Sequence, residues 1–314
     1  MDHQNASKLP VINLSKENLK HSTCKQVRNA LEEYGCFIAV YDKTPLIFLE
    51  LRDSIFFIAD QLFQLPLETK AKNTSKTPFF GYLGDLQGVV QLYESLGIED
   101  ATSLQQIKSF CELMWPDRNE EFCEIIHQYA NLLAELEKMV VRMVFEGYGL
   151  KELCESHINS TTFLLRLNSY RVRQPKEKII GATAHTDKSF LTILDQDQVN
   201  GLEVKLKDQQ WHAVDFLPSS FVVMAGEALR AWSNNRIQSP VHQVTMNGKN
   251  ISRFSIGIFS YHNGIIHIPT EMIDEEQFPR RFKSFDHLGF VAFFANDFKL
   301  GRNSNCSIVS YCGV

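Results

Sequence analysis

The chain has 314 residues, of which 44% are hydrophobic and 22% are charged, and its formal net charge is −5 at pH 7. This is the composition of an ordinary globular protein, and the acidic balance argues against a nucleic-acid-binding face. No apolar run is long enough to span a membrane, and the N-terminus lacks the apolar core of a secretory signal. The seven cysteines are scattered without a Cys-x-x-Cys pair, so we expect free thiols in a cytoplasmic protein.

The N-terminal region, residues 1–155, is expected to be mainly helical. Apolar residues recur at helical spacing over 46–63 and, in the longest such pattern of the chain, over 121–148. We expect this long helix to pack behind a sheet. A shorter helix is predicted to end at Gly35, because glycine is common just past a helix C-terminus. Short strands are predicted over 9–14 and 36–40.

Residues 77–97 combine several glycines with aromatic residues, which is unusual for a loop at a protein surface. Phe80, Tyr82 and Tyr93 belong to this stretch, and Trp115 follows a short apolar helix. Two interpretations stay open for the stretch: a loop that packs over the core, or a wall that faces a substrate. In the second interpretation, these four aromatic residues contact the substrate.

From Thr161 onward the pattern changes to short strands separated by turns. Strands are predicted over 163–172, 190–194, 202–206, 211–214, 221–224, 242–244 and 254–259. Many short, evenly spaced strands are typical of a sandwich, a barrel or a jelly roll. We therefore expect a mixed α/β chain in which residues 156–314 form the β core and the helical region packs on it.

One stretch of the β region carries a candidate metal site. His185 and Asp187 stand two residues apart, and residues of a strand at this spacing point to the same side. His242 lies in a later predicted strand and supplies a third candidate ligand. Two histidines and one carboxylate on one face, with open positions opposite, form the facial triad of non-haem Fe(II) oxygenases.

A pair of polar residues, Arg253 and Ser255, follows the triad at strand spacing. The planar fork of an arginine binds both oxygens of a carboxylate, so Arg253 suits an acidic cosubstrate. Taken singly, each of these motifs is weak, because His-x-Asp and Arg-x-Ser arise by chance. The ordered set, placed in strand-like segments, favours a metal centre. Zinc hydrolysis is an alternative for the triad, but no neighbouring carboxylate is marked as its general base.

The ordered set resembles the plant 2-oxoglutarate- and Fe(II)-dependent dioxygenases, and the resemblance covers nearly the whole chain. The matching blocks are Leu9–Leu14, Glu33–Phe37, Asn168-Ser169-Tyr170, Val199–Val204 and Trp232–Arg236. Within the family, Tyr41-Asp42-Lys43, Gly81-Tyr82-Leu83 and Glu94–Ile98 look most like the branch that modifies glucosinolate side chains.

The resemblance implies a jelly-roll core that binds Fe(II), 2-oxoglutarate and O₂, with ascorbate as a helpful additive and a monomeric state. O₂ then oxidises 2-oxoglutarate to succinate and CO₂ while a substrate C–H bond is oxidised. Besides Arg253 and Ser255, it implies that Tyr170 and Asn168 bind the cosubstrate. The chain departs from the family pattern at Tyr41, at Met224-Ala225-Gly226-Glu227 and at Gln243, and we expect none of these departures to touch the metal ligands.

The leading hypothesis is an oxygenase that hydroxylates, desaturates or rearranges a small, largely apolar plant specialised metabolite. The aromatic stretch motivates the apolar part, and Tyr261, just after the Arg253 strand, is a further candidate substrate contact. The first alternative is a plant hormone oxidase of the auxin or gibberellin type. A second arginine facing the pocket would favour it, and the sequence does not show which arginine that is. The second alternative, from another class, is a non-catalytic jelly-roll binding protein.

Overall fold

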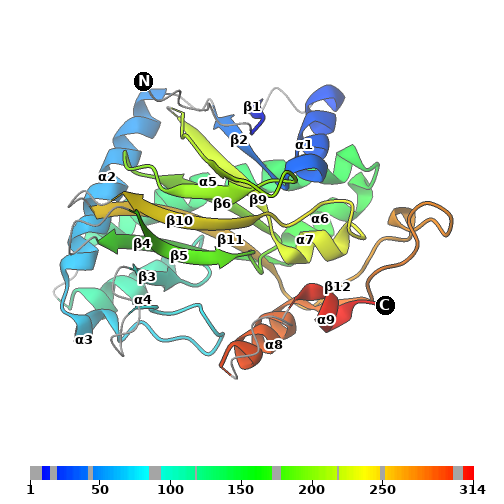
Figure 1. The fold of residues 1–314 in the computed structure, drawn as a ribbon. Coiled ribbons are helices and arrows are strands. Elements are labelled where there is room, and N and C mark those ends of the chain that lie inside the picture. Colours follow the sequence, from blue (N-terminus) through cyan, green and yellow to red (C-terminus); the bar gives the residue numbers. More distant parts are fainter. Residues whose placement is uncertain are drawn as a thin grey trace.

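The computed structural model describes residues 9–14, 20–41, 45–84, 93–116, 119–171, 178–217, 219–247, 252–299 and 307–314. Two β-sheets form its centre (Figure 1). The larger sheet has seven strands in the order β1 (Val11–Leu14), β2 (Cys36–Tyr41), β9 (Ser220–Ala225), β6 (Leu191–Gln196), β11 (Ser252–His262), β4 (Thr161–Arg171) and β3 (Tyr93–Ile98). The smaller has four in the order β5 (Lys178–His185), β10 (Val241–Asn247), β7 (Leu202–Lys205) and β8 (Trp211–Ala213).

The two sheets pack against each other through apolar side chains. Leu202 and Val204 of β7 share one buried cluster with Val222 and Met224 of β9. Inward residues alternate with outward ones along these strands, as the period of two in a strand requires. The expected mixed α/β fold with a jelly-roll core is confirmed. Strands β1, β2 and β3, which precede residue 155, complete the larger sheet.

The helices of the first half cover the outer face of the larger sheet. They are α1 (His21–Tyr34), α2 (Pro45–Gln64), α3 (Leu67–Lys70), α4 (Leu104–Met114), α5 (Glu120–Gly147) and α6 (Lys151–Asn159). As predicted, the long α5 packs against β6 and β11. The predicted stop at Gly35 is also confirmed, because Gly35 has φ 72° and its N–H donates to Leu31 O. None of the described helices is long and apolar enough to cross a bilayer.

The C-terminal part packs at one end of the sheets. It comprises α7 (Glu227–Trp232), β12 (Ile265–Ile266), the 3₁₀ turn η2 (Thr270–Met272), β13 (Phe285–Asp286), α8 (His287–Lys299) and α9 (Ile308–Cys312). Figure 1 shows α9 between α7 and α8, and α9 contacts both of these helices. The segment with the predicted metal ligands His185 and Asp187 lies at this end, since it contacts Glu227 of α7 and His287 of α8.

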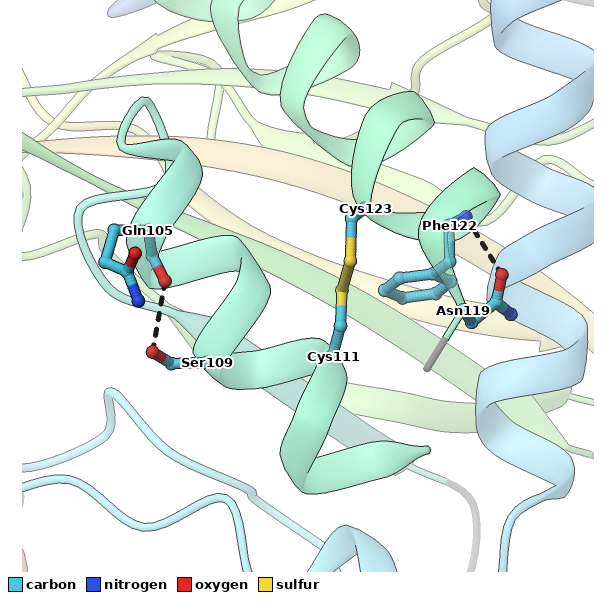
Figure 2. The surroundings of a disulfide bond; sticks show 6 residues. All are labelled: Gln105, Ser109, Cys111, Asn119, Phe122 and Cys123. Atoms are coloured by element: carbon cyan, nitrogen blue, oxygen red, sulfur yellow. Dashed lines mark hydrogen bonds between the residues drawn. A yellow bond between two sulfur atoms is a disulfide. The ribbon is translucent and has the colours of Figure 1, made fainter. Parts of the chain in front are cut away.

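The expectation of free thiols is wrong for one pair of cysteines. Cys111 near the end of α4 and Cys123 near the start of α5 form a disulfide bond (Figure 2). The rings of Phe110 and Phe122 stack at 6.2 Å beside it, so helix packing brings the two sulfurs together. No spacing rule marks such a pair in the sequence. The free cysteines among the described residues are Cys24, Cys36, Cys154 and Cys312.

The core holds a histidine that makes stability depend on pH. His157 is buried, its ring lies 4.2 Å from that of Phe190 and 5.4 Å from that of Phe145, and its Nε2 has no partner among the described residues. Burial, and then the nearby His262 and His287, lowers the pKa of His157 to about 3. A group whose pKa is lower in the folded state contributes stability above its unfolded pKa, and that contribution falls as the pH drops below it.

We therefore expect acid to destabilise the protein partly through His157. In His157→Phe, the free energy of unfolding should fall less between pH 7.5 and pH 5.5 than in wild type, by about 1.4 kcal/mol, because protonation one unit below an unfolded pKa of about 6.5 costs that amount. Urea unfolding at the two pH values measures the difference. Equal losses in the two proteins would contradict this role for His157.

Candidate metal and cosubstrate site

The three predicted metal ligands meet at the ends of two neighbouring strands. His185 is the last residue of β5, and its register partner on β10 is His242. Asp187 Oδ1 lies 3.8 Å from His185 Nε2 and 3.6 Å from His242 Nε2. One ligand atom from each residue lies within 4.8 Å of the others, so the three side chains can hold a single metal ion.

The strand-spacing argument for His185 and Asp187 needs a correction. β5 ends at His185, and Asp187 follows it in the segment that leads to β6. The two side chains therefore converge because the chain turns after the strand, and not because they share one face of it. The register pair of His185 with His242 is the contact that a strand does supply.

Backbone contacts hold both imidazoles in the state that binds metal. His185 Nδ1 lies 2.7 Å from Thr183 O, and His242 Nδ1 lies 3.2 Å from Pro240 O. A carbonyl oxygen only accepts, so each Nδ1 carries a proton, and in the neutral ring Nε2 is then the nitrogen that can bind a metal. Desolvation and the adjacent His242 ring lower the pKa of His185 to about 4, which keeps the His185 ring neutral near pH 7.

The segment that carries Asp187 is fixed by partners that the sequence did not reveal. Thr192 Oγ1 donates to Asp187 Oδ2 at 2.7 Å and leaves Oδ1 facing the two imidazoles. The Glu227 N–H donates to Asp187 O at 2.8 Å, and His287 Nε2 donates to Lys188 O at 2.8 Å. The expectation that the departure at Glu227 stays clear of the ligands is therefore wrong. Helix α7 begins at Glu227, and its first N–H donates to the backbone carbonyl of Asp187.

The triad is accessible from one side. The His185 side chain is 44% exposed, whereas those of Asp187 and His242 are 8% and 7% exposed. A ligand therefore reaches the metal position past His185.

Arg253 has unpartnered donors that suit an acidic ligand. Its side chain is fully buried on β11, and its Nη2 donates to Gln196 Oε1 at 2.7 Å. Its Nε and Nη1 have no hydrogen-bond partner among the described residues. A buried charged donor without a partner is costly, so these two N–H groups fit a carboxylate that binds there. The absence of a side chain at Gly201 keeps the space beside Arg253 open, since a Cβ at residue 201 would lie 3.1 Å from the Arg253 Cδ and Nε.

The other predicted cosubstrate residues surround Arg253. Its guanidinium lies 4.9 Å from the centre of the Tyr170 ring, and burial raises the pKa of Tyr170 while Arg253 and Ser255 both oppose the rise. Asn168 donates to Ser255, while its Oδ1 accepts from Ser95 Oγ at 2.7 Å. Asn168 thus orients its neighbours. Tyr93 O–H also donates to Asn168 Oδ1, at 3.0 Å, so this residue of the aromatic stretch lies beside the predicted cosubstrate residues.

The structure separates the remaining aromatic candidates. Phe80 packs against Tyr261 with ring centres 4.7 Å apart, and the Asp187 carboxylate helps to raise the pKa of Tyr261. Tyr82 instead donates to Glu94 Oε1 at 2.7 Å. Trp115 packs on Phe122 in the helical layer, at 4.3 Å, and the structure does not bring it to the triad. Residues 85–92 of the stretch lie outside the described residues.

Two imidazoles and one carboxylate that share a metal position, with a buried arginine on the facing sheet that has two unpartnered donors among the described residues, match the facial triad of a non-haem Fe(II) oxygenase. Comparison with known proteins agrees. Residues 161–262 match the model of the 2OG-Fe(II) oxygenase superfamily, and residues 9–120 match that of the N-terminal region named after a non-haem dioxygenase in morphine synthesis. The chain belongs to the 2OG-Fe(II) oxygenase superfamily.

Its relatives extend over most of its length. A probable 2-oxoglutarate-dependent dioxygenase of Arabidopsis thaliana, AOP1.2, is 42% identical over 303 residues, which cover 92% of this chain and 91% of the relative. Among solved structures, the rice dioxygenase for auxin oxidation is 26% identical with a TM-score of 0.77, over 98% of this chain and 100% of that one. The 2-oxoglutarate complex of the Arabidopsis thaliana dioxygenase for auxin oxidation 1 is 27% identical with a TM-score of 0.75, over 87% and 100%.

The family predicted from the motifs is thus confirmed. The protein is an oxidoreductase that uses Fe(II), O₂ and 2-oxoglutarate, and its substrate is a small molecule.

Proposed function

We propose that the enzyme oxidises a C–H bond of a small, largely apolar plant specialised metabolite, with His185, Asp187 and His242 as the Fe(II) ligands and Arg253 as the anchor of 2-oxoglutarate. The observation that carries the proposal is the pair of unpartnered donors on the buried Arg253 in the same core as the ligand triad. When bound, the metal and the cosubstrate supply the oxidising chemistry. The residues of the chain orient them and limit the access of water.

An apolar cluster beside the triad supports the apolar part of the substrate. Phe80, Leu164, Tyr261 and Val291 form a buried group with ring contacts between Phe80 and Tyr261. Tyr261 belongs to it and lies within electrostatic reach of Asp187. A C–H bond held against this cluster lies near the metal ligands.

A metabolite panel tests the reaction and the substrate class together. Purified enzyme with Fe(II), 2-oxoglutarate and ascorbate is screened for succinate release that rises on addition of each compound. We expect apolar aromatic and alkyl compounds to stimulate release, and hydrophilic sugars and amino acids to leave it at the basal level. Stimulation by the hydrophilic compounds alone would contradict the proposed substrate class.

Phe80 should govern coupling of the reaction. Phe80→Leu shortens the side chain that packs on Tyr261, so we expect the enzyme to hold its substrate less firmly. The KM for substrate and the ratio of succinate to product should both rise severalfold. The affinity for 2-oxoglutarate should stay unchanged. Kinetics of succinate and product formation check this. Trp115→Leu is the matched control, since Trp115 packs on Phe122. Wild-type coupling in Phe80→Leu would show that the cluster is packing alone.

A hormone oxidase is the second candidate function. It is favoured by a second buried arginine, Arg166, on the same strand as Tyr170 and Asn168. The rice and Arabidopsis thaliana structures of similar fold are described as dioxygenases for auxin oxidation. We further propose a monomeric, cytoplasmic enzyme that binds neither nucleic acid nor membranes. The acidic charge supports the absence of a nucleic-acid face, and the four free cysteines among the described residues support the compartment, although Cys111 and Cys123 form a disulfide.

A further inference from the structure

A buried carboxylate beside the triad joins three parts of the chain. Glu227 begins α7 and is 4% exposed. Its Oε1 accepts hydrogen bonds from Thr186 Oγ1 and, at 2.7 Å, from Lys188 Nζ. Its Oε2 accepts the N–H of Ile308, the first residue of α9, at 2.6 Å. One oxygen is therefore engaged by the two neighbours of the proposed metal ligand Asp187, and the other by α9.

Glu227 also holds the ligand segment through its backbone, since its N–H donates to Asp187 O at 2.8 Å. On the side of α8, Lys188 Nζ lies 4.3 Å from the centre of the Phe294 ring. Figure 1 shows α7, α8 and α9 together at this end of the molecule. Residues 186–188 thus contact α7 and α8 directly, and they are linked to α9 through the Glu227 carboxylate.

Both groups that meet this carboxylate depend on it. The first N–H groups of a helix have no partner within the helix, and the Ser307 hydroxyl already accepts the N–H of Ser310. The buried Ile308 N–H is therefore left to Glu227, and a buried donor that loses its acceptor is costly. The Lys188 side chain is 11% exposed, and a charge at that depth needs its counter-ion.

We propose that Glu227 is a positioning residue that couples the docking of α9 to the binding of the metal ion. The inference rests on the proposed function, in which Asp187 is a ligand of Fe(II). Docked α9 holds the carboxylate in place, and the carboxylate fixes the residues on both sides of Asp187. Detachment of α9 frees the Glu227 side chain and loosens the ligand segment. A purely structural Glu227 would stabilise the fold and leave the metal affinity unchanged.

Hydrogen–deuterium exchange tests the coupling on the wild-type chain. Mass spectrometry follows peptides that contain α9, in the metal-free protein and in protein loaded with Mn(II) in place of iron. Two coupled equilibria change each other by the same factor. The loss of an outer partner of a metal ligand costs about ten- to a hundredfold in affinity, so Mn(II) should slow the exchange of α9 about tenfold. In Glu227→Gln, which keeps the size of the side chain and removes its charge, Mn(II) should leave this exchange unchanged.

Calorimetric titration with Mn(II) measures the other side of the coupling. Glu227→Gln should weaken Mn(II) binding about tenfold. Ile308→Pro removes the N–H at the first position of α9, where proline is well tolerated, and should weaken binding severalfold. The preceding Ser307 has φ −142° and ψ 166°, an extended conformation that a following proline allows. The double variant should lose no more affinity than Glu227→Gln alone, because both changes break the same link.

Two control variants separate the coupling from a general loss of stability. Ile308→Val trims the same buried side chain but keeps the N–H, so it should bind Mn(II) as the wild type does. Glu94→Gln makes the same substitution in another ion pair, that of Glu94 with Lys70 at 2.6 Å, which is not linked to the triad. It should also bind Mn(II) with the wild-type affinity.

The outcomes distinguish the coupling from the proposed function. A wild-type protein that does not bind Mn(II) would overturn the proposed metal centre and the coupling with it. Normal Mn(II) binding by the wild type without slower exchange of α9 would overturn the coupling alone, and this result needs no variant to fold. Wild-type affinity in Glu227→Gln, or an equal loss of affinity in Glu94→Gln, would also overturn the coupling.

Discussion

Asp187→Ala will abolish Fe(II)-dependent succinate release and weaken metal binding by more than about a hundredfold, since the loss of an outer partner of a metal ligand alone costs about ten- to a hundredfold. Asp187 is the only charged ligand of the triad, and its Oδ1 lies within 4 Å of both imidazole Nε2 atoms. His185→Ala and His242→Ala should each abolish turnover as well. Calorimetric titration with Mn(II) measures the affinity, and circular dichroism checks that the fold is intact.

Two further variants sharpen this test. Thr192→Val removes the hydrogen bond to Asp187 Oδ2 but no ligand, so we expect an intermediate loss of metal affinity of about ten- to a hundredfold. His212→Ala is the matched control, because His212 forms a pair with Asp208 at 2.9 Å outside the triad. A triad variant that kept near-normal activity with bound iron would remove that residue from the site.

Arg253→Lys will raise the KM for 2-oxoglutarate by about ten- to a hundredfold and leave the KM for substrate nearly unchanged, because the variant keeps a charge but loses the two-pronged donor. The unpartnered Nε and Nη1 are the atoms that the variant deletes or displaces. Initial rates of succinate release over a range of 2-oxoglutarate concentrations give the constants.

Arg142→Lys is the control for Arg253→Lys, since Arg142 pairs with Glu155 among the helices at 2.8 Å. Gly201→Ala offers a second approach to the same pocket. The added Cβ would press on Thr245 O at 2.8 Å and on Arg253 at 3.1 Å, so the variant should also raise the KM for 2-oxoglutarate. Unchanged 2-oxoglutarate dependence in Arg253→Lys would show that another residue holds the cosubstrate.

The residues that carry the chemistry were predictable because they recur as local motifs. His185, Asp187, His242 and Arg253 stand in short patterns, and the structure gathers the first three around one position. The helix end at Gly35 was predictable for a local reason too, since its φ of 72° is a conformation that glycine adopts without strain. The long helix α5 followed from the period of its apolar residues.

What was missed depends on contacts between distant parts of the chain. Thr192 and Glu227 reach Asp187 only after the chain folds back, and neither residue type marks a site by itself. β5 was not predicted because Gly181 and Ala182 interrupt its strand pattern.

The most direct test of the account is the coupling between metal and 2-oxoglutarate. Calorimetric titration of 2-oxoglutarate into the metal-free protein and into the anaerobic Fe(II)-loaded protein compares its affinity in the two states. If the triad and Arg253 hold the two ends of the same molecule, Fe(II) should tighten binding at least tenfold in the wild type and not at all in His242→Ala. Equal affinity with and without Fe(II) in the wild-type protein would contradict the account.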